Sequence, residues 1–163
     1  MENIVRKRET LHPHCFACSP DRADGLGFLC GVRPDGTVAG RANLDSRFEG
    51  YPGMAQGGVV ATLLDSAMAQ CLMARGIAAV TGDLQVRFRH PVALEVPTQV
   101  QAWIVESAPP LYRLRSEARQ GQRIMATGRG VFVDREGQCR SELDTASATG
   151  ENAGDADAGP PGA

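Results

Sequence analysis

The sequence lacks a long hydrophobic run, and this absence excludes several classes of protein. The longest apolar stretch, residues 59–74, spans 16 residues and contains Asp65 and Gln70. A helix needs roughly 20 apolar residues to cross a bilayer. No apolar stretch follows the basic residues 6–8, so the N-terminus does not resemble a secretory signal. We therefore expect a cytoplasmic protein that does not associate with a membrane.

The charge balance and the cysteine count argue against two further classes, nucleic-acid-binding proteins and disulfide-stabilised proteins. Residues 141–163 hold five acidic and no basic side chains, which leaves residues 1–140 with 17 basic and 14 acidic ones. That excess is too small for a nucleic-acid binder, although a local cluster could bind a phosphorylated ligand. The five cysteines are an odd number without an export signal, which favours reduced thiols over a disulfide framework.

The most regular pattern in the chain is one long helix over residues 57–75. This segment is rich in Ala, Leu and Met, lacks internal Pro, and is apolar on nearly every side. Gly76 is expected to end the helix, with Arg75 near the negative end of its dipole. Because such a helix has no polar face, other structure must enclose it.

Strands are predicted on both sides of this helix. A turn at residues 34–36 indicates a hairpin within residues 26–44, and four later segments alternate or are rich in strand-forming residues. Their short links favour antiparallel pairing. The four later strands are expected at residues 84–88, 98–106, 111–119 and 124–133.

These elements predict an α+β fold of the hot-dog type, in which a curved antiparallel sheet wraps around one long central helix. A helix beside a flat sheet is the alternative, and it would expose apolar helix surface. We expect an N-terminal segment at residues 1–24, the hot-dog domain at 25–138 and a disordered tail at 139–163. The tail is rich in Ala, Gly, Asp and Pro and has almost no large apolar residue.

Asp65 is the first candidate for chemistry. It is the only charged residue between Glu49 and Arg75. Burying a carboxylate without compensation is costly, so such a residue is paired or kept for a task. A local hydrogen bond or contact with water at a helix edge is the alternative.

The entry to the helix at Gly57 and Gly58 strengthens the functional interpretation, because the first amides of a helix lack intrahelical partners and glycine lets a ligand approach them.

The spacing of these groups has a consequence for assembly. Gly57 and Asp65 are eight residues apart, or about 12 Å along a helix axis at about 1.5 Å per residue. One carbonyl carbon cannot lie beside both. If both act on one substrate, the helix N-terminus of one subunit must face Asp65 of another. We therefore expect a homodimer or a dimer of dimers.

Residues 49–68 and 79–92 carry a family resemblance. With their loop, Gly-Gly pair, helical Asp and strand-opening Thr, they resemble the PaaI-type and human thioesterase-superfamily acyl-CoA hydrolases. The resemblance implies that Gly57 offers its amide to the thioester carbonyl, that Asp65 is the base or nucleophile, and that Thr81 orients water or the carboxylate. Gln56 stands where His is usual, and a carboxamide can position a group but cannot titrate.

The predicted function is hydrolysis of acyl-CoA without a cofactor. Gly58 would approach the substrate, and Arg87 and Arg89 would bind the CoA phosphates. The alternatives are a non-catalytic acyl-CoA or metabolite-binding hot-dog protein, or a dehydratase or hydratase. Dehydration normally requires a His and carboxylate pair, and no histidine is near the helix in the sequence.

A metal site is considered and not expected. His12, His14, Cys15 and Cys18 are four potential zinc ligands, and the two thiols have CxxC spacing. A second ligand pair at matching distance is absent from the sequence. Packed or exposed thiols are therefore the preferred interpretation, and no metal is predicted.

Overall fold

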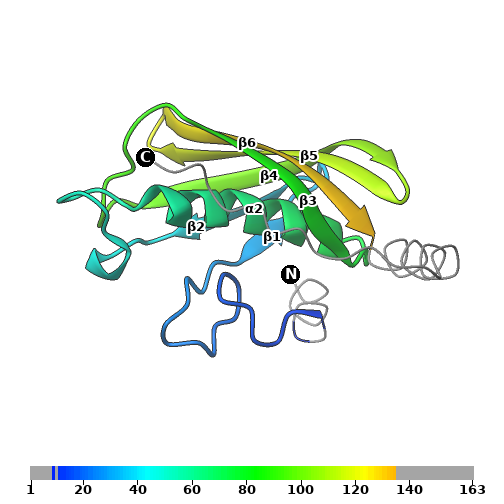
Figure 1. The fold of residues 1–163 in the computed structure, drawn as a ribbon, viewed down its shortest axis with the longest axis horizontal. Coiled ribbons are helices and arrows are strands. Elements are labelled where there is room, and N and C mark those ends of the chain that lie inside the picture. Colours follow the sequence, from blue (N-terminus) through cyan, green and yellow to red (C-terminus); the bar gives the residue numbers. More distant parts are fainter. Residues whose placement is uncertain (1–8, 10, 135–163) are drawn as a thin grey trace, which may run out of the picture.

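The computed structural model describes residue 9 and residues 11–134 of the 163-residue chain (Figure 1). The predicted tail at residues 139–163 lies outside the described residues. Six strands and one long helix make up the described domain. They are β1 (Cys30–Val32), β2 (Val38–Ala42), α2 (Gly57–Met73), β3 (Ala79–Phe88), β4 (Thr98–Ala108), β5 (Leu111–Gln120) and β6 (Arg123–Asp134), with a short 3₁₀ turn η1 (Ser46–Phe48) before the helix.

The six strands form one sheet with the order β1-β2-β4-β5-β6-β3. Every neighbouring pair is antiparallel, as the short connections predicted. The sheet lies across one side of α2 (Figure 1), and α2 contacts all six strands. The predicted hot-dog fold is confirmed.

The helix is enclosed as its composition predicted. Ten of its 17 residues are buried, including Leu63, Leu64 and Met68 at full burial. The helix ends at Met73, two residues earlier than expected, because Gly76 turns the chain with a φ of 80°. Arg75 still satisfies the helix end by donating a hydrogen bond of 2.9 Å to the carbonyl of Cys71.

Strand β3 lies at one edge of the sheet, and its apolar side is only partly covered. The strand begins at Ala79, five residues before the predicted alternation at 84–88. Leu84 is 36% exposed and Phe88 is 54% exposed. On the more central β5, the predicted inner residues Tyr112 and Leu114 are buried. The period of two therefore identifies the apolar side of β3 correctly, while one chain alone leaves that side open.

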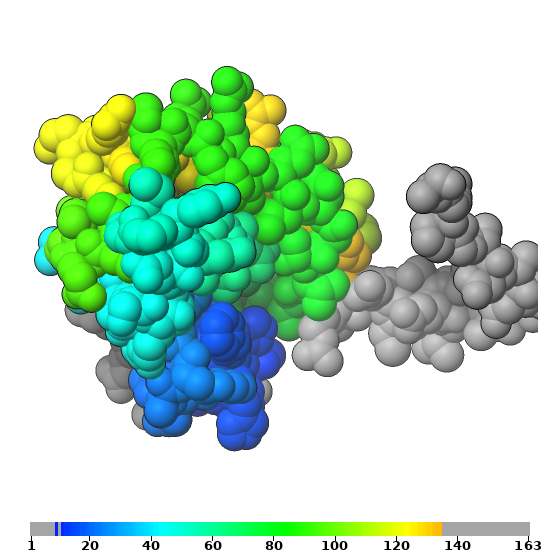
Figure 2. All heavy atoms as spheres, turned by 60° about the vertical axis from the view of Figure 1, so that its left-hand side comes forward, coloured from blue at the N-terminus to red at the C-terminus, as the bar shows by residue number. Residues whose placement is uncertain are grey.

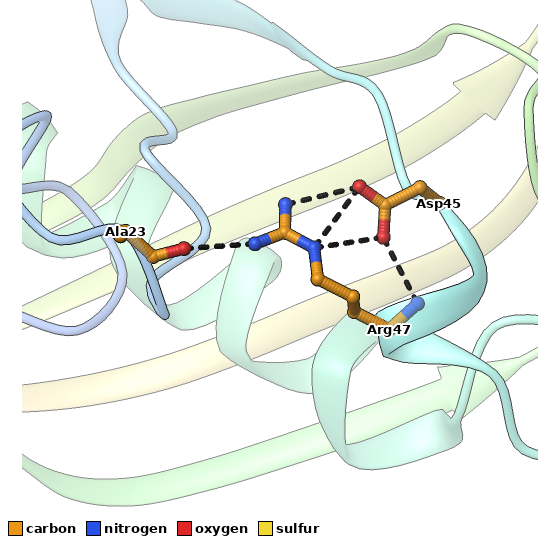
Figure 3. Close-up of polar contacts among 3 residues, drawn as sticks. All are labelled: Ala23, Asp45 and Arg47. Atoms are coloured by element: carbon orange, nitrogen blue, oxygen red, sulfur yellow. Dashed lines mark hydrogen bonds and ion pairs between the residues drawn. The ribbon is translucent and has the colours of Figure 1, made fainter.

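The segment before β1 covers the side of α2 that faces away from the sheet (Figures 1 and 2). Residues 12–29 form turns and loops without helix or strand. Cys18 and Phe28 in this segment are each 1% exposed. Arg47 fixes the segment from outside, because its guanidinium donates to the carbonyl of Ala23 at 2.8 Å while also pairing with Asp45 (Figure 3). The segment thus packs against the domain.

No helix among the described residues combines the length and the apolar character that crossing a membrane requires.

Candidate active site

Asp65 and Thr81 meet where α2 faces the edge strand. The Oγ1 of Thr81 donates a hydrogen bond of 2.8 Å to Oδ1 of Asp65. The structure thus brings together two residues that the sequence separates by sixteen positions. The described residues provide no hydrogen-bond partner for Oδ2 of Asp65, so that oxygen remains available to a water or a substrate.

The surroundings of Asp65 favour its protonated form more than water does. Partial burial raises the pKa of the Asp65 carboxyl, while the hydrogen bond from Thr81 lowers it by a smaller amount. Asp65 is half-buried rather than enclosed. The result is an accessible carboxylate that is more basic than an ordinary aspartate, as general base catalysis near neutral pH requires.

The N-terminus of α2 is shaped by Gln56 and the two glycines after it. Gln56 is the N-cap residue, and its Oε1 accepts a hydrogen bond of 3.1 Å from the amide of Val59. A Cβ at position 58 would lie 2.8 Å from that Oε1, so a larger residue there would displace the capping side chain. Gly57 and Gly58 are exposed, and the first amides of a helix have no intrahelical acceptor. This end of the helix can bind a carbonyl or oxyanion.

A largely apolar pocket of about 430 Å³ opens beside this helix N-terminus. Phe88 forms one wall, since a Cβ on Gly57 would lie only 3.6 Å from its ring. The sequence alone assigned no role to several of the residues that line this pocket. The one sign of it in the sequence is a pair of apolar side chains, Tyr51 and Met54, on either side of a Pro-Gly turn. The lining residues are Tyr51, Met54, Ala55, Gly57, Val60, Phe88, Arg89, His90, Pro91 and Val92.

His90 is the unexpected member of this pocket. The guanidinium of Arg123 lies 3.0 Å from its Nδ1. A guanidinium only donates hydrogen bonds, so Nδ1 is the acceptor in this contact. A histidine that is distant in the sequence is thus close to Gly57 in space.

Of the two predicted phosphate-binding arginines, one points away from α2 and the other lines the pocket. Arg87 pairs in register with Thr127 on the outer face, away from α2. Arg89 follows the end of β3 and lines the pocket with Gly57. Both side chains are exposed. Only Arg89 therefore shares a pocket with the helix N-terminus.

A family model described as the thioesterase superfamily matches residues 52–108. The matched region contains Gly57, Asp65 and Thr81. A comparison with curated proteins finds no match.

Solved structures with the same fold carry related descriptions. A thioesterase superfamily protein superposes with a TM-score of 0.70 at 25% identity, and the match covers 74% of this chain and 63% of that protein. The present chain thus spans less than two thirds of its length. The E. coli PaaI protein from the phenylacetic acid degradation operon gives a TM-score of 0.70 at 17% identity, with coverage of 83% and 96%. A hypothetical thioesterase from Streptococcus pneumoniae, solved with coenzyme A, gives 0.62 at 16% identity, with coverage of 66% and 88%.

These findings confirm the resemblance to PaaI-type proteins of the thioesterase superfamily that the sequence predicted. The described domain has the hot-dog fold.

Proposed function

We propose that this protein hydrolyses acyl-CoA thioesters to the free acid and CoA. The observation that carries the proposal is the Asp65–Thr81 pair: a half-buried carboxylate with a raised pKa, held by one hydrogen bond and open at its second oxygen. Such a group serves hydrolysis either by activating water or by attacking the thioester carbonyl itself. The match of residues 52–108 to the thioesterase superfamily model supports the same chemistry.

The proposed reaction divides its roles between the N-terminus and the middle of α2. Water activated by Asp65, or Asp65 itself through an anhydride, attacks the thioester carbon. The amide of Gly57 stabilises the negative charge that develops on the carbonyl oxygen. The C–S bond breaks and CoA leaves as a thiolate that takes up a proton. In the anhydride route, water then releases the acid and restores Asp65. Thr81 holds the carboxylate in position, and Gln56 maintains the geometry of the helix start.

A homodimer completes the site in this proposal. Gly57 and Asp65 lie on one helix about 12 Å apart, so one thioester needs the two groups from different subunits. The edge strand β3 supports such an assembly, because the face from which Thr81 bonds Asp65 also leaves Leu84 and Phe88 exposed. Pairing across this edge by two-fold symmetry would produce two equivalent sites.

Arg89 is the proposed contact for the CoA phosphates. It is exposed beside the apolar pocket and Gly57, and guanidinium groups bind phosphate with paired hydrogen bonds. The similar structure from S. pneumoniae was solved with coenzyme A, which supports CoA as the thiol. Arg87→Ala and Arg89→Ala form a matched pair for testing this contact. We expect Arg89→Ala to raise KM more than Arg87→Ala, because Arg87 is on the outer face.

A hydratase is the second candidate, because His90 and Gly57 share a pocket. Hydration or dehydration of an acyl-CoA leaves the thioester intact, whereas hydrolysis releases a thiol. Steady-state release of CoA from aryl, short-chain and medium-chain acyl-CoAs, measured with a thiol reagent, therefore separates the two. Asp65→Asn is the background control. Release that never exceeds this control for any substrate would overturn the proposed hydrolase.

A further inference from the structure

A second group of reactive side chains lies in the segment before β1. One ligand atom each from His12, Cys15 and Cys18 lies within 4.8 Å of the other two. In a tetrahedral zinc site, with bonds of about 2.0 Å to nitrogen and about 2.3 Å to sulfur, neighbouring ligand atoms lie about 3.5–4 Å apart. The three side chains are therefore close to the spacing that one ion requires.

We propose that His12, Cys15 and Cys18 bind a zinc ion. Two thiolates and one imidazole form a donor set that suits zinc and is unsuited to Mg²⁺ or Ca²⁺, which take oxygen ligands. The prediction of no metal rested on the absence of a second ligand pair. In the fold, the third ligand comes from the same turn as the two thiols.

Local hydrogen bonds shape the backbone around these ligands. The amide of Cys15 donates to the carbonyl of His12 at 3.3 Å, and the amide of Ser19 donates to the carbonyl of Cys15 at 3.0 Å. The fully buried Ser19 also donates through Oγ to the carbonyl of Pro13 at 2.9 Å. These bonds close two successive turns, which place the three ligands on one side. A donor set held in advance loses less entropy when the ion binds.

A bound zinc ion would link the core at Cys18 to the groove at His12, which are otherwise connected only by loops of residues 12–29. Cys18 is buried in the core, whereas His12 lines a groove with Ala69 and Met73 of α2 and Val80 of β3. Residues 12–29 have neither helix nor strand to stabilise them. In small elements of this kind, metal binding supplies free energy of folding directly.

The site lies beside the proposed active site without being part of it. Ala69 is one helical turn beyond Asp65, and Val80 precedes Thr81. The zinc ion would fix the loop that covers this end of the groove. Water would complete the four ligands that zinc takes. The proposed role of the ion is to hold this loop, so zinc binding does not depend on the proposed thioesterase activity.

Metal content of the full-length protein tests the proposal. Protein produced with zinc, passed through gel filtration and analysed by inductively coupled plasma mass spectrometry should contain about one zinc per chain. Cys15→Ser, Cys18→Ser and His12→Ala should each lower this content at least about fivefold. His14→Ala is the matched control, because His14 is an exposed histidine in the same turn region, and its zinc content should not change.

Cobalt provides a measurement that does not depend on whether the variants fold. Co²⁺ added to the metal-free wild-type protein should produce a thiolate-to-metal charge-transfer band, and zinc should displace it. Wild-type protein that binds neither ion would overturn the proposal, as would zinc content that survives in folded variants of all three ligands. A Cys15–Cys18 disulfide in the isolated protein, seen as two missing thiols under non-reducing denaturation, would also overturn it.

Discussion

Two polar residues on opposite sides of α2 have opposite relations to their surroundings. Gln70 faces β1 and is 2% exposed; its Oε1 accepts from the amide of Cys30 at 2.8 Å, and its Nε2 donates to the carbonyl of Phe28 and to Ser66. Asp65 faces β3, is half-buried, and has one hydrogen bond. A polar group whose bonds are all used stabilises the fold, whereas one with an unused atom at an opening can act on a ligand.

The largest effect is expected from removing the charge of Asp65, the residue with an unused oxygen. Asp65→Asn keeps the volume but removes the base or nucleophile, so kcat should fall by roughly 10²-fold or more. Turnover of acyl-CoA and a thermal melt on the same sample measure this. A well-folded variant with near wild-type hydrolysis would remove Asp65 from the mechanism.

The same variant should also change how stability depends on pH. Because the pKa of Asp65 is raised in the folded state, the folded protein holds this proton to higher pH than the unfolded chain does. Asp65 therefore lowers the free energy of unfolding as pH rises through the window between its ordinary pKa and its raised one, and the loss persists at neutral pH. Asp65→Asn should be as stable as the wild type or more stable at pH 7. Denaturant unfolding at pH 4 and pH 7 measures the difference, which should shrink at the lower pH.

Gln70, whose side-chain amide is fully hydrogen-bonded, should behave in the opposite way. Gln70→Leu leaves the buried amide of Cys30 and the carbonyl of Phe28 without their partner, so the free energy of unfolding should fall by about 2 kcal/mol or more. The kcat of the molecules that remain folded should stay near that of the wild type. Gln85→Leu on the exposed strand β3 is the matched control and should change stability little. Equal losses in both variants would contradict the structural role of Gln70.

A smaller effect is expected from the partner of Asp65. Thr81→Val keeps the shape but removes the hydroxyl that bonds the carboxylate, and a hydrogen bond to a charged group contributes about 1.5–3 kcal/mol. We expect kcat to fall about tenfold or more. Since the lost bond had lowered the pKa of Asp65, the acidic limb of the pH–rate profile should move to higher pH. Thr81→Ser should restore both, and a profile that does not move would separate Thr81 from Asp65.

The smallest effect should come from a buried hydroxyl with no partner. Ser116 is 1% exposed, and its Oγ has no hydrogen-bond partner among the described residues. Ser116→Ala removes a polar atom that gains nothing from burial, so stability should be unchanged or slightly higher, within about 0.5 kcal/mol. A loss as large as that of Gln70→Leu would show that Ser116 has a partner in solution.

The sequence predicted the helix and the strands because both depend on local periodicity. It could not predict that Thr81 lies on the same face of β3 as Leu84. Thr81 opposes Phe132 and Leu84 opposes Gly130, two inner positions of β6, because a bulge lies between Thr81 and Asp83. A strict period of two would turn Thr81 and Leu84 to opposite faces. The extra residue of the bulge lets both face α2 and places Arg87 outside.

The remaining gaps have a similar cause. The bonds of Gln70 to β1 connect residues forty positions apart, and the approach of His90 to Gly57 depends on where β3 ends. Contacts of this kind depend on tertiary packing, which local patterns do not encode. Asp65 was recognisable beforehand because a charge in an apolar helix is costly wherever the helix packs.

The cap of α2 also decides which atoms of Gln56 a substrate can meet. Its carbonyl oxygen already accepts from the amide of Val59, while its side-chain NH₂ carries two donors. What position 56 adds next to Gly57 is therefore hydrogen-bond donors rather than a charge. A histidine would offer one donor or one acceptor according to its proton, whereas the capped carboxamide keeps the same polarity at every pH. The entrance to the helix is thus electropositive by construction, whatever the protonation state of the rest of the site.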